Sequence, residues 1–189
     1  TYLSASTLNL SMSSSPSRLN PILANDSASS EISDWLFNGL FKYDKNGNHT
    51  VDLAQSYEFE TPTKLIIKLR NNVLWHDGVK FTSKDVVFTY EKIIDPKVFN
   101  SIKSNFQEVQ SVKAIDDFTL EIIYKQPYFK AIETWMVGIL PYHLLKDEEN
   151  LMTSSFNKNP IGTGSYKLKE FKTAQDIELI ANENYFEGI

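Results

Sequence analysis

The sequence contains no cysteine among its 189 residues, and several classes of site depend on that residue. Without thiols, a chain forms no disulfide, thiolate nucleophile, thiolate zinc site or iron–sulfur cluster. Histidine is also scarce, since His49, His76 and His143 lie far apart and no HExxH pattern occurs. The sequence therefore predicts no metal site, no cofactor and no catalytic residue.

Positive charge and long apolar runs are scarce as well. Lys and Arg total 19 against 24 Asp and Glu, which gives a formal net charge of -5, and Arg18 and Arg70 are the two arginines. This sign disfavours phosphate contacts, so nucleic acid is not an expected partner. Uninterrupted apolar runs are only a few residues long, against the roughly 20 that cross a bilayer. With 41% hydrophobic residues, we expect a soluble chain with a buried core.

Periodic patterns predict an α+β fold. Alternating apolar residues indicate a strand around Leu8 to Met12, a hairpin over 57–69, a short strand at 73–75, a second hairpin over 109–124 and final strands at 165–171 and 176–181. Helical spacing predicts helices at about 29–41, from Thr82 to Asp95, around 129–136 and at 142–150. The strands group in hairpins rather than in βαβ units.

One core is expected to join the second helix to the hairpins. The second helix begins with Thr82 followed by Asp85, a spacing typical of a capping box. The apolar residues expected in this core are Trp75, Val86, Val87, Tyr90, Ile93, Leu120 and Ile122.

Three short motifs invite catalytic or phosphate-binding interpretations that their context disfavours. His76-Asp77-Gly78 and Asp116-Asp117 have the composition of turns. Gly162-Thr163-Gly164 precedes a strand and lacks the Gly-Lys-Ser/Thr ending of a phosphate loop, so we interpret it as a structural turn. Phe99 and Phe106 lie in an irregular connection, where aromatic residues are candidates for stacking on a ligand.

An ordered series of short motifs runs through most of the chain. The motifs are Leu19-Asn20-Pro21, Asn38-Gly39-Leu40, Asp52-Leu53-Ala54-Gln55-Ser56-Tyr57, Val73-Leu74-Trp75-His76-Asp77-Gly78, Phe81-Thr82-Ser83-Lys84-Asp85-Val86-Val87-Phe88, Pro160-Ile161-Gly162-Thr163-Gly164-Ser165-Tyr166 and Asn182-Glu183-Asn184-Tyr185-Phe186. In this order they resemble the extracellular solute-binding proteins of family 5, which serve ABC importers of peptides, nickel and haem. Ser165, where the family usually has Pro, and Ala181, where Arg is common, depart from the pattern.

The resemblance implies the first lobe of a two-lobed fold like that of type II periplasmic binding proteins, with a mixed sheet and a hairpin-rich subdomain. It divides the lobe into the first strand, loop and helix (1–48), the hairpin-rich α/β subdomain (49–158) and the return strands (159–189). Family members are more than twice as long, so we interpret the chain as a fragment without the second lobe. That second lobe carries the family's acidic anchor for a peptide amino group.

Two segments are candidates for ligand contact. Residues 29 to 32 match a stretch that lines the cleft in oligopeptide binders, and free N–H groups at a helix start are able to receive ligand oxygens. The alternative is that these serines only cap the helix. The segment from Phe99 to Ile102 is the second candidate. The candidate binding residues are Ser29, Ser30, Glu31, Ile32, Phe99 and Ile102.

The leading functional hypothesis is a monomeric, non-enzymatic lobe that captures short peptides for an ABC permease in the inner membrane. The resemblance implies a periplasmic location, or an extracellular one with the full-length parent anchored as a lipoprotein. A receptor for a nickel chelate or haem is the alternative within the family, although nickel receptors use cleft arginines and no arginine follows Arg70. A hydrolase is disfavoured because no coherent Ser-His-acid or metal set occurs.

Overall fold

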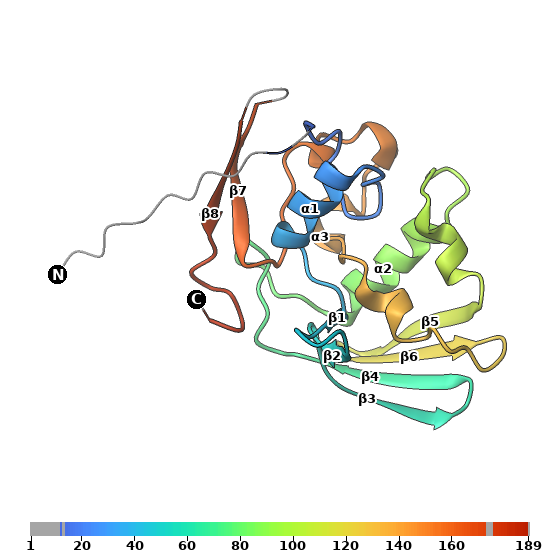
Figure 1. Ribbon diagram of the computed structural model, residues 1–189. Helices are drawn as coiled ribbons and strands as arrows, with labels where there is room; N and C mark the ends of the chain where they lie inside the picture. Colours follow the sequence, from blue (N-terminus) through green and yellow to red (C-terminus); the bar gives the residue numbers. More distant parts are fainter. Residues whose placement is uncertain (1–11, 13, 173–175, 189) are drawn as a thin grey trace.

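The computed structural model describes residue 12, residues 14–172 and residues 176–188, which form an α+β arrangement (Figure 1). The α-helices are α1 (Ser27–Leu36), α2 (Ser83–Ile94) and α3 (Tyr142–Leu145), and the short 3₁₀ helices are η1 (Ile102–Phe106), η2 (Glu133–Met136), η3 (Leu151–Thr153) and η4 (Ser155–Asn157). The strands are β1 (Phe41–Tyr43), β2 (His49–Val51), β3 (Ala54–Thr61), β4 (Lys64–Leu69), β5 (Val109–Asp116), β6 (Thr119–Tyr124), β7 (Tyr166–Phe171) and β8 (Ile177–Ala181). None of these helices is long and apolar enough to cross a membrane.

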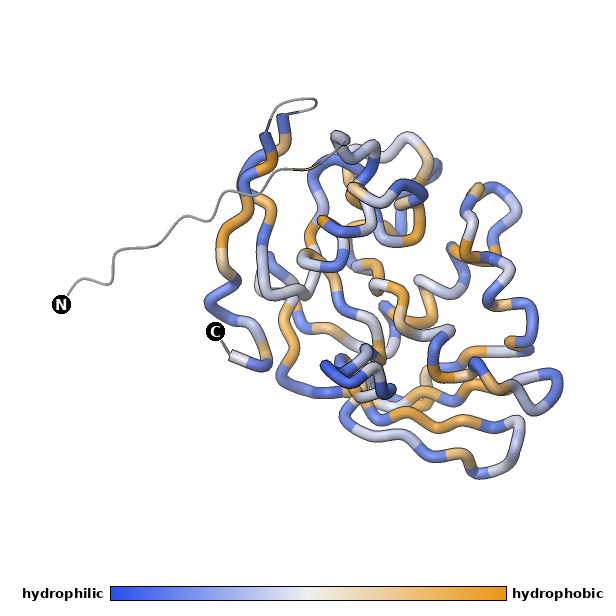
Figure 2. The backbone as a smooth tube through the Cα atoms, viewed as in Figure 1, coloured by the Kyte–Doolittle hydropathy of each residue, from blue (hydrophilic) through white to orange (hydrophobic). Residues whose placement is uncertain are grey.

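A four-stranded antiparallel sheet with the order β3-β4-β6-β5 forms the base of the molecule, and α2 lies against one of its faces (Figure 1). It consists of the two predicted hairpins side by side, with Leu65 opposite Ile122 and Ile67 opposite Leu120. These four residues share one face because strand side chains alternate, and all are fully buried. In Figure 2, hydrophobic residues recur along these strands with hydrophilic ones between them.

Two smaller hairpins, β1-β2 and β7-β8, complete the described sheets. All strand pairs among the described residues are antiparallel, so the mixed sheet that we expected does not occur in this part of the chain. The strand predicted around Leu8 to Met12 lies outside the described residues, apart from Met12.

The buried face of α2 differs from the predicted face at Val87. Trp75, Val86, Tyr90, Ile93, Leu120 and Ile122 are buried as expected. Val87 is only partly buried, whereas Phe88 and Thr89 are buried in its place. Phe88 and Thr89 are buried because residues 140–142, which lead into α3, contact them. The backbone N–H of Leu140 donates to Thr89 Oγ1 at 2.8 Å, and the rings of Phe88 and Tyr142 pack edge-on with their centroids 5.6 Å apart.

Several predicted elements are shorter than expected. Helix α1 ends at Leu36 rather than at residue 41, because Phe37 is extended and Phe41 begins β1. The strand predicted at 73–75 is reduced to a single bridge between Leu74 and Lys80. The helix expected over 142–150 is the four-residue α3. At the end of α1, Phe41 is buried as part of strand β1, because tertiary packing overrides the local helical pattern.

The Gly162-Thr163-Gly164 motif packs directly against the end of α1. The N–H of Gly164 donates to the carbonyl oxygen of Leu36 at 2.9 Å. A Cβ atom at Gly162 would overlap the Leu36 carbonyl oxygen, and one at Gly164 would overlap that of Trp35. Both glycines are therefore required by a close backbone approach, which agrees with the structural interpretation of this motif.

The different burial of Val86 and Val87 on α2 can be tested with a pair of variants. Val86→Asp places a charge among fully buried residues and should lower the free energy of unfolding by about 3 kcal/mol or more. Val87→Asp should cost clearly less, because its side chain reaches solvent. Urea unfolding followed by circular dichroism measures both, and equal losses would show that the assigned face of α2 is wrong.

The glycine contact gives a second test. Gly162→Ala should destabilise the chain by more than Gly78→Ala, because the first forces two backbone segments apart. Gly78 has a φ of 89° but no atom within 4 Å of an added Cβ, so alanine there should cost only the backbone strain of about 1–2 kcal/mol. Thermal melts of the two variants should rank in this order; the reverse order would contradict the close approach.

Candidate functional site

An open groove of about 260 Å³ runs between α1 on one side and η1 and η2 on the other. In Figure 1, α1 and the green segment that contains η1 stand on facing sides of this region. The groove is lined by Pro21, Ala24, Ser30, Ser33, Asp34, Ile102, Asn105, Phe106, Glu133, Thr134, Met136, Val137 and Gly138. Its walls thus come from three segments that are far apart in the sequence.

The groove brings together one residue from each of the two predicted binding segments. Ser30 lies on the α1 wall and Ile102 on the opposite wall. Ile32 is buried in the core, whereas Glu31 is exposed and is not among the lining residues. Phe99 is 86% exposed and lies outside the lining. Phe106 lines the groove but is itself 2% exposed, packed edge-on against Trp135 at 5.3 Å.

Ser29 is occupied by internal contacts at the start of α1. Its hydroxyl donates to Asp26 Oδ2 at 2.7 Å and accepts the N–H of Ser17 at 2.9 Å, while its own N–H donates to Asp26 Oδ1 at 2.8 Å. Burial raises the pKa of Asp26, but the hydrogen bonds from Ser29 and Ser17 outweigh it and the net pKa is lowered. Asp26, and not one of the serines, is thus the N-cap residue of α1, and Ser29 is engaged in this cap as a donor. Of Ser29 and Ser30, only Ser30 lines the groove.

The groove carries negative charge without a basic lining residue. Asp34 and Glu133 both line it, and no Lys or Arg is among the lining residues. Glu133 Oε1 lies 3.2 Å from His49 Nε2. The residue Asp34 is exposed, but partial desolvation by the surrounding groove raises the pKa of its carboxyl group. Asp34 lies in the last turn of α1, which carries no basic residue.

His76 contacts residues 162–164, the segment that precedes β7 and that we call the return segment. Its Nδ1 accepts the N–H of Gly162 at 3.1 Å, and its Nε2 lies 3.1 Å from the carbonyl oxygen of Gly164. Because a backbone N–H can only donate, Nδ1 is the acceptor and Nε2 carries the proton. Burial lowers the pKa of His76 to about 4, so the ring is neutral near pH 7.

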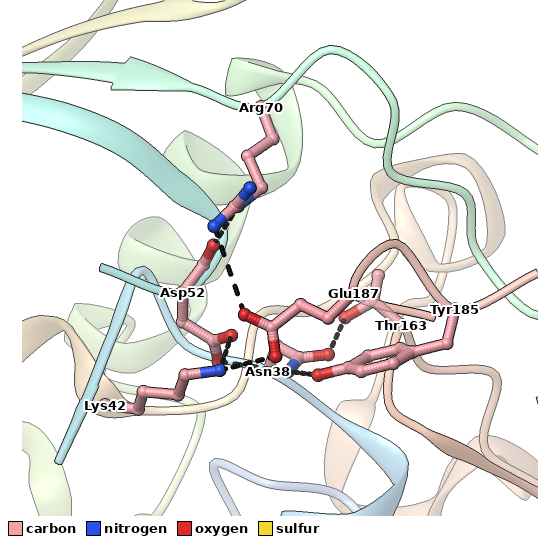
Figure 3. A network of polar contacts seen from close by, with 7 residues as sticks. All are labelled: Asn38, Lys42, Asp52, Arg70, Thr163, Tyr185 and Glu187. Atoms are coloured by element: carbon pink, nitrogen blue, oxygen red, sulfur yellow. Dashed lines mark hydrogen bonds and ion pairs between the residues drawn. The ribbon is translucent and has the colours of Figure 1, made fainter. Parts of the chain in front are cut away.

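Asn38, just after α1, is the centre of a second set of polar contacts (Figure 3). Its Nδ2 donates to Asp52 Oδ2 at 3.0 Å and to the Tyr185 hydroxyl at 3.1 Å, and its Oδ1 accepts the hydroxyl of Thr163 at 3.0 Å. One amide side chain thus joins the segment after α1 to the return segment and to the last described residues.

Charged residues extend this network. Lys42 Nζ lies 3.2 Å from Asp52 Oδ1 and donates to Glu187 Oε2 at 2.7 Å, while Arg70 Nε donates to the carbonyl oxygen of Asp52 at 2.6 Å. Burial raises the pKa of Asp52, against the opposing effect of Asn38 and Lys42. Because these groups already contact one another, the network is a structural joint rather than an open binding site.

Two histidine–carboxylate pairs resemble parts of a catalytic set. His143 Nε2 lies 2.8 Å from Asp77 Oδ2, and His49 pairs with Glu133 as described. Within residues 14–172 and 176–188, neither imidazole has a hydroxyl hydrogen-bonded to it, and no group of three or more His, Asp or Glu is placed to hold a metal ion. Among the described residues, neither pair is thus part of a hydrogen-bonded Ser-His-acid set.

Most groove residues could not be found from the sequence. Asp34, Asn105 and Thr134 belong to no motif, and only the folded chain brings them together. Asp34 gave no signal either, because the helix predicted at about 29–41 placed it mid-helix, and only the structure puts it in the last turn of α1.

Comparison of this chain with known proteins identifies its family. The profile of the bacterial extracellular solute-binding proteins, family 5 Middle, matches residues 49–188. The chain belongs to this family. Its members are binding proteins of transport systems, and the expected α+β solute-binding fold is confirmed by solved structures of relatives.

Individual relatives are much longer than this chain. The oligopeptide-binding protein AppA of Bacillus subtilis is 34% identical over 179 residues, which cover 92% of this chain and 33% of AppA. The structure of AppA with a nonapeptide has a TM-score of 0.86 at 32% identity, covering 93% of this chain and 36% of that one. NikZ of Campylobacter jejuni with Ni(L-His) has a TM-score of 0.83 at 39% identity, covering 90% of this chain and 34% of NikZ. The chain thus spans about a third of these relatives.

The contacts of His76 with Gly162 and Gly164, which we call the His76 clamp, predict that the stability of the fold depends on pH. The pKa of about 4 in the folded chain lies below the ordinary 6.5, so the clamp's stability is fully present above pH 6.5 and is lost as pH falls toward 4. The shift corresponds to as much as about 3 kcal/mol. Unfolding free energies of wild type and His76→Gln between pH 7 and 4 should converge as the pH falls; parallel curves would contradict the clamp.

Proposed function

We propose that the chain forms the first lobe of the substrate-binding component of an ABC importer and captures short peptides for delivery to a membrane permease. The observation that carries this proposal is the likeness to AppA, which extends over 93% of this chain with a TM-score of 0.86. The groove between α1, η1 and η2 supports it, because the two segments proposed for ligand contact meet there.

The proposed division of labour follows from the joints around α1. We propose that the segments before residue 49 and after residue 158 act as one unit, and that residues 49–158 act as the hairpin-rich subdomain. Hydrogen bonds from Gly164 to Leu36 and from Thr163 to Asn38 join the described parts of the first unit, and His76 joins this unit to the subdomain. An extended peptide presents N–H and C=O groups that need partners once water is excluded. One lobe offers partners on one side only, and we propose that a second lobe in a chain of the relatives' length completes the enclosure.

The remaining parts of the proposal concern the oligomeric state, the location and the partners of the protein. The protein works as a monomer without catalytic activity, in the periplasm or, anchored as a lipoprotein, at the cell surface. The description of its family as extracellular supports this placement. Its partners are the peptide and the permease of the inner membrane.

A nickel chelate is the second candidate ligand, favoured by the 39% identity to NikZ, whose structure contains Ni(L-His). The described arginines argue against a similar chelate here. Neither Arg18 nor Arg70 lines the groove, and Arg70 is engaged with Asp52 and Glu187. Anion recognition by a guanidinium fork therefore has no free donor in this lobe's groove.

The proposal predicts weak but localised binding by this chain alone. If one lobe supplies about half of a micromolar receptor's roughly 8 kcal/mol, the dissociation constant falls in the millimolar range. Titration of the ¹⁵N-labelled chain with a mixed pool of di- to pentapeptides should shift the amide signals of Ser30, Ile102 and Thr134. Signals of the β3-β4 turn at residues 61–63 serve as the unaffected control.

Two outcomes would contradict this prediction. Micromolar binding would show that residues 1–189 enclose the ligand without a second lobe. Larger shifts with Ni(L-His) than with any peptide would favour the nickel alternative.

A further inference from the structure

We propose that Asn46 is a site of spontaneous chemical modification, at which the side-chain amide is converted to aspartate and isoaspartate through a cyclic imide. The reacting unit is the dipeptide Asn46-Gly47, in the turn between β1 and β2. The reaction needs only water and a base, so it is independent of the proposed peptide-binding function.

The first observation is that the sequence contains two Asn-Gly dipeptides, Asn38-Gly39 and Asn46-Gly47. An imide forms when the backbone nitrogen of the following residue bonds to the carbonyl carbon of the asparagine side chain. Glycine hinders this approach least, because it has no Cβ atom. The same local chemistry is thus available at two positions, and the surrounding structure must distinguish them.

The side chain of Asn38 is held by three hydrogen bonds. Its Nδ2 donates to Asp52 Oδ2 at 3.0 Å and to the Tyr185 hydroxyl at 3.1 Å, and its Oδ1 accepts the hydroxyl of Thr163 at 3.0 Å. The following residue, Gly39, is buried. Turning the Asn38 amide toward the Gly39 nitrogen would break these bonds away from water, so we expect Asn38 to be protected.

Asn46 and Gly47 lie in an exposed turn. Both residues are exposed, and no hydrogen bond joins the Asn46 side-chain amide to another residue in the part of the chain that the structure describes. Apart from the chain neighbours, no heavy atom lies within 4 Å of a Cβ atom added at Gly47, so the space beside this residue is open. The flanking strands β1 and β2 have only three residues each. Local opening of so short a hairpin costs little free energy.

The Gly47 nitrogen becomes available when the turn opens. Its N–H donates to the carbonyl oxygen of Asp44 at 3.0 Å, and Asp44 Oδ1 accepts the N–H groups of Asn46 and Asn48, each at 2.8 Å. These bonds lie at the surface, where water can replace them. The Asn46 amide therefore waits for a local opening, whereas the Asn38 amide must first lose its contacts with three other segments.

The reaction balances without an oxidant or a reductant. Hydroxide or a buffer base takes the proton of the Gly47 N–H, and the nitrogen bonds to Asn46 Cγ. The Cγ–Nδ2 bond breaks, and Nδ2 leaves as ammonia after gaining a proton from water. Water then opens the imide: attack at Cγ gives aspartate, whereas attack at the backbone carbonyl carbon gives isoaspartate. The isoaspartate backbone runs through Cβ and Cγ and is one carbon longer.

The longer backbone of isoaspartate should disturb the contact between this hairpin and the groove. It does not fit the bonds that close the turn, from Gly47 N–H to the Asp44 carbonyl and from Asp44 N–H to the Asn48 carbonyl at 2.8 Å. His49, the first residue of β2, lies with its Nε2 3.2 Å from Oε1 of Glu133, which lines the groove. We therefore expect the modified chain to show shifted amide signals at His49 and Glu133.

The test compares the two dipeptides within one sample. The folded 189-residue chain is kept for several days at mildly alkaline pH, digested under acidic conditions and analysed by liquid chromatography and mass spectrometry for loss of the amide and for isoaspartate. We expect conversion at Asn46 to be at least about tenfold faster than at Asn38, which corresponds to about 1.4 kcal/mol more opening free energy at Asn38. In urea, both positions should react at similar rates because each precedes glycine.

Two variants assign the reaction and its control. Asn46→Gln should abolish the product in the peptide that contains residue 46, because its longer side chain closes a six-membered imide only slowly. Tyr185→Phe removes one partner of Asn38 and should raise the conversion rate at Asn38 while leaving the rate at Asn46 unchanged. Circular dichroism checks that both variants are folded, and the comparison within the wild-type chain stands without them.

Two results would overturn the inference. Equal conversion at Asn38 and Asn46 in the folded chain would show that the structure does not distinguish the two dipeptides. Absence of product at Asn46 in the folded chain, whether or not the chain in urea reacts, would show that this turn is not a modification site. Conversion at Asn46 that becomes faster as the pH is raised would support it, since the attacking nitrogen must lose its proton.

Discussion

The close approach of the return segment to the carbonyl end of α1 is the constraint on which the other joints depend. Gly162 and Gly164 have no side chain to keep the two backbones apart, so Gly164 hydrogen-bonds to Leu36 and the helix end is covered. His76 and Asn38 then hold the same return segment from two further directions. Helix α1 is thereby fixed, and with it one wall of the groove.

The polar joints around α1 differ in how they tolerate burial. Asn38 is a neutral hub whose donors and acceptor are matched by Asp52, Tyr185 and Thr163, so its burial leaves no unpaired group. Asp52 is a buried carboxylate whose pKa is raised by burial, and the hydrogen bond from Asn38 and the ion pair with Lys42 oppose that rise. The groove has the opposite character, because Asp34 and Glu133 stand there without a lysine or arginine. Polar groups in the network around Asn38 thus contact one another, whereas the Asp34 carboxylate in the groove has no ion-pair partner among the described residues.

Local signals in the sequence predicted those elements whose geometry is decided by neighbouring residues. The N–H of Thr82 donates to Asp85 at 2.8 Å, as a capping spacing requires, and both hairpins have their predicted turns. Segments distant in the sequence determine where α1 ends and why Phe88 and Thr89 are buried while Val87 is only partly buried. The α1 wall was partly anticipated through Ser30, but Asp34 enters the groove only because η1 and η2 fold against that helix.

The joint between α1 and the return segment also orders the assembly of the chain. The hairpins β3-β4 and β5-β6 close through short turns, whereas Leu36 meets Gly164 only after all of residues 49–158 have been placed between them. Contacts between distant segments are slow to form because the connecting chain must first give up its entropy. A ten-residue helix is marginal by itself in water. We therefore expect the α1 wall to be completed late in folding, after the hairpins of the subdomain that forms the opposite wall.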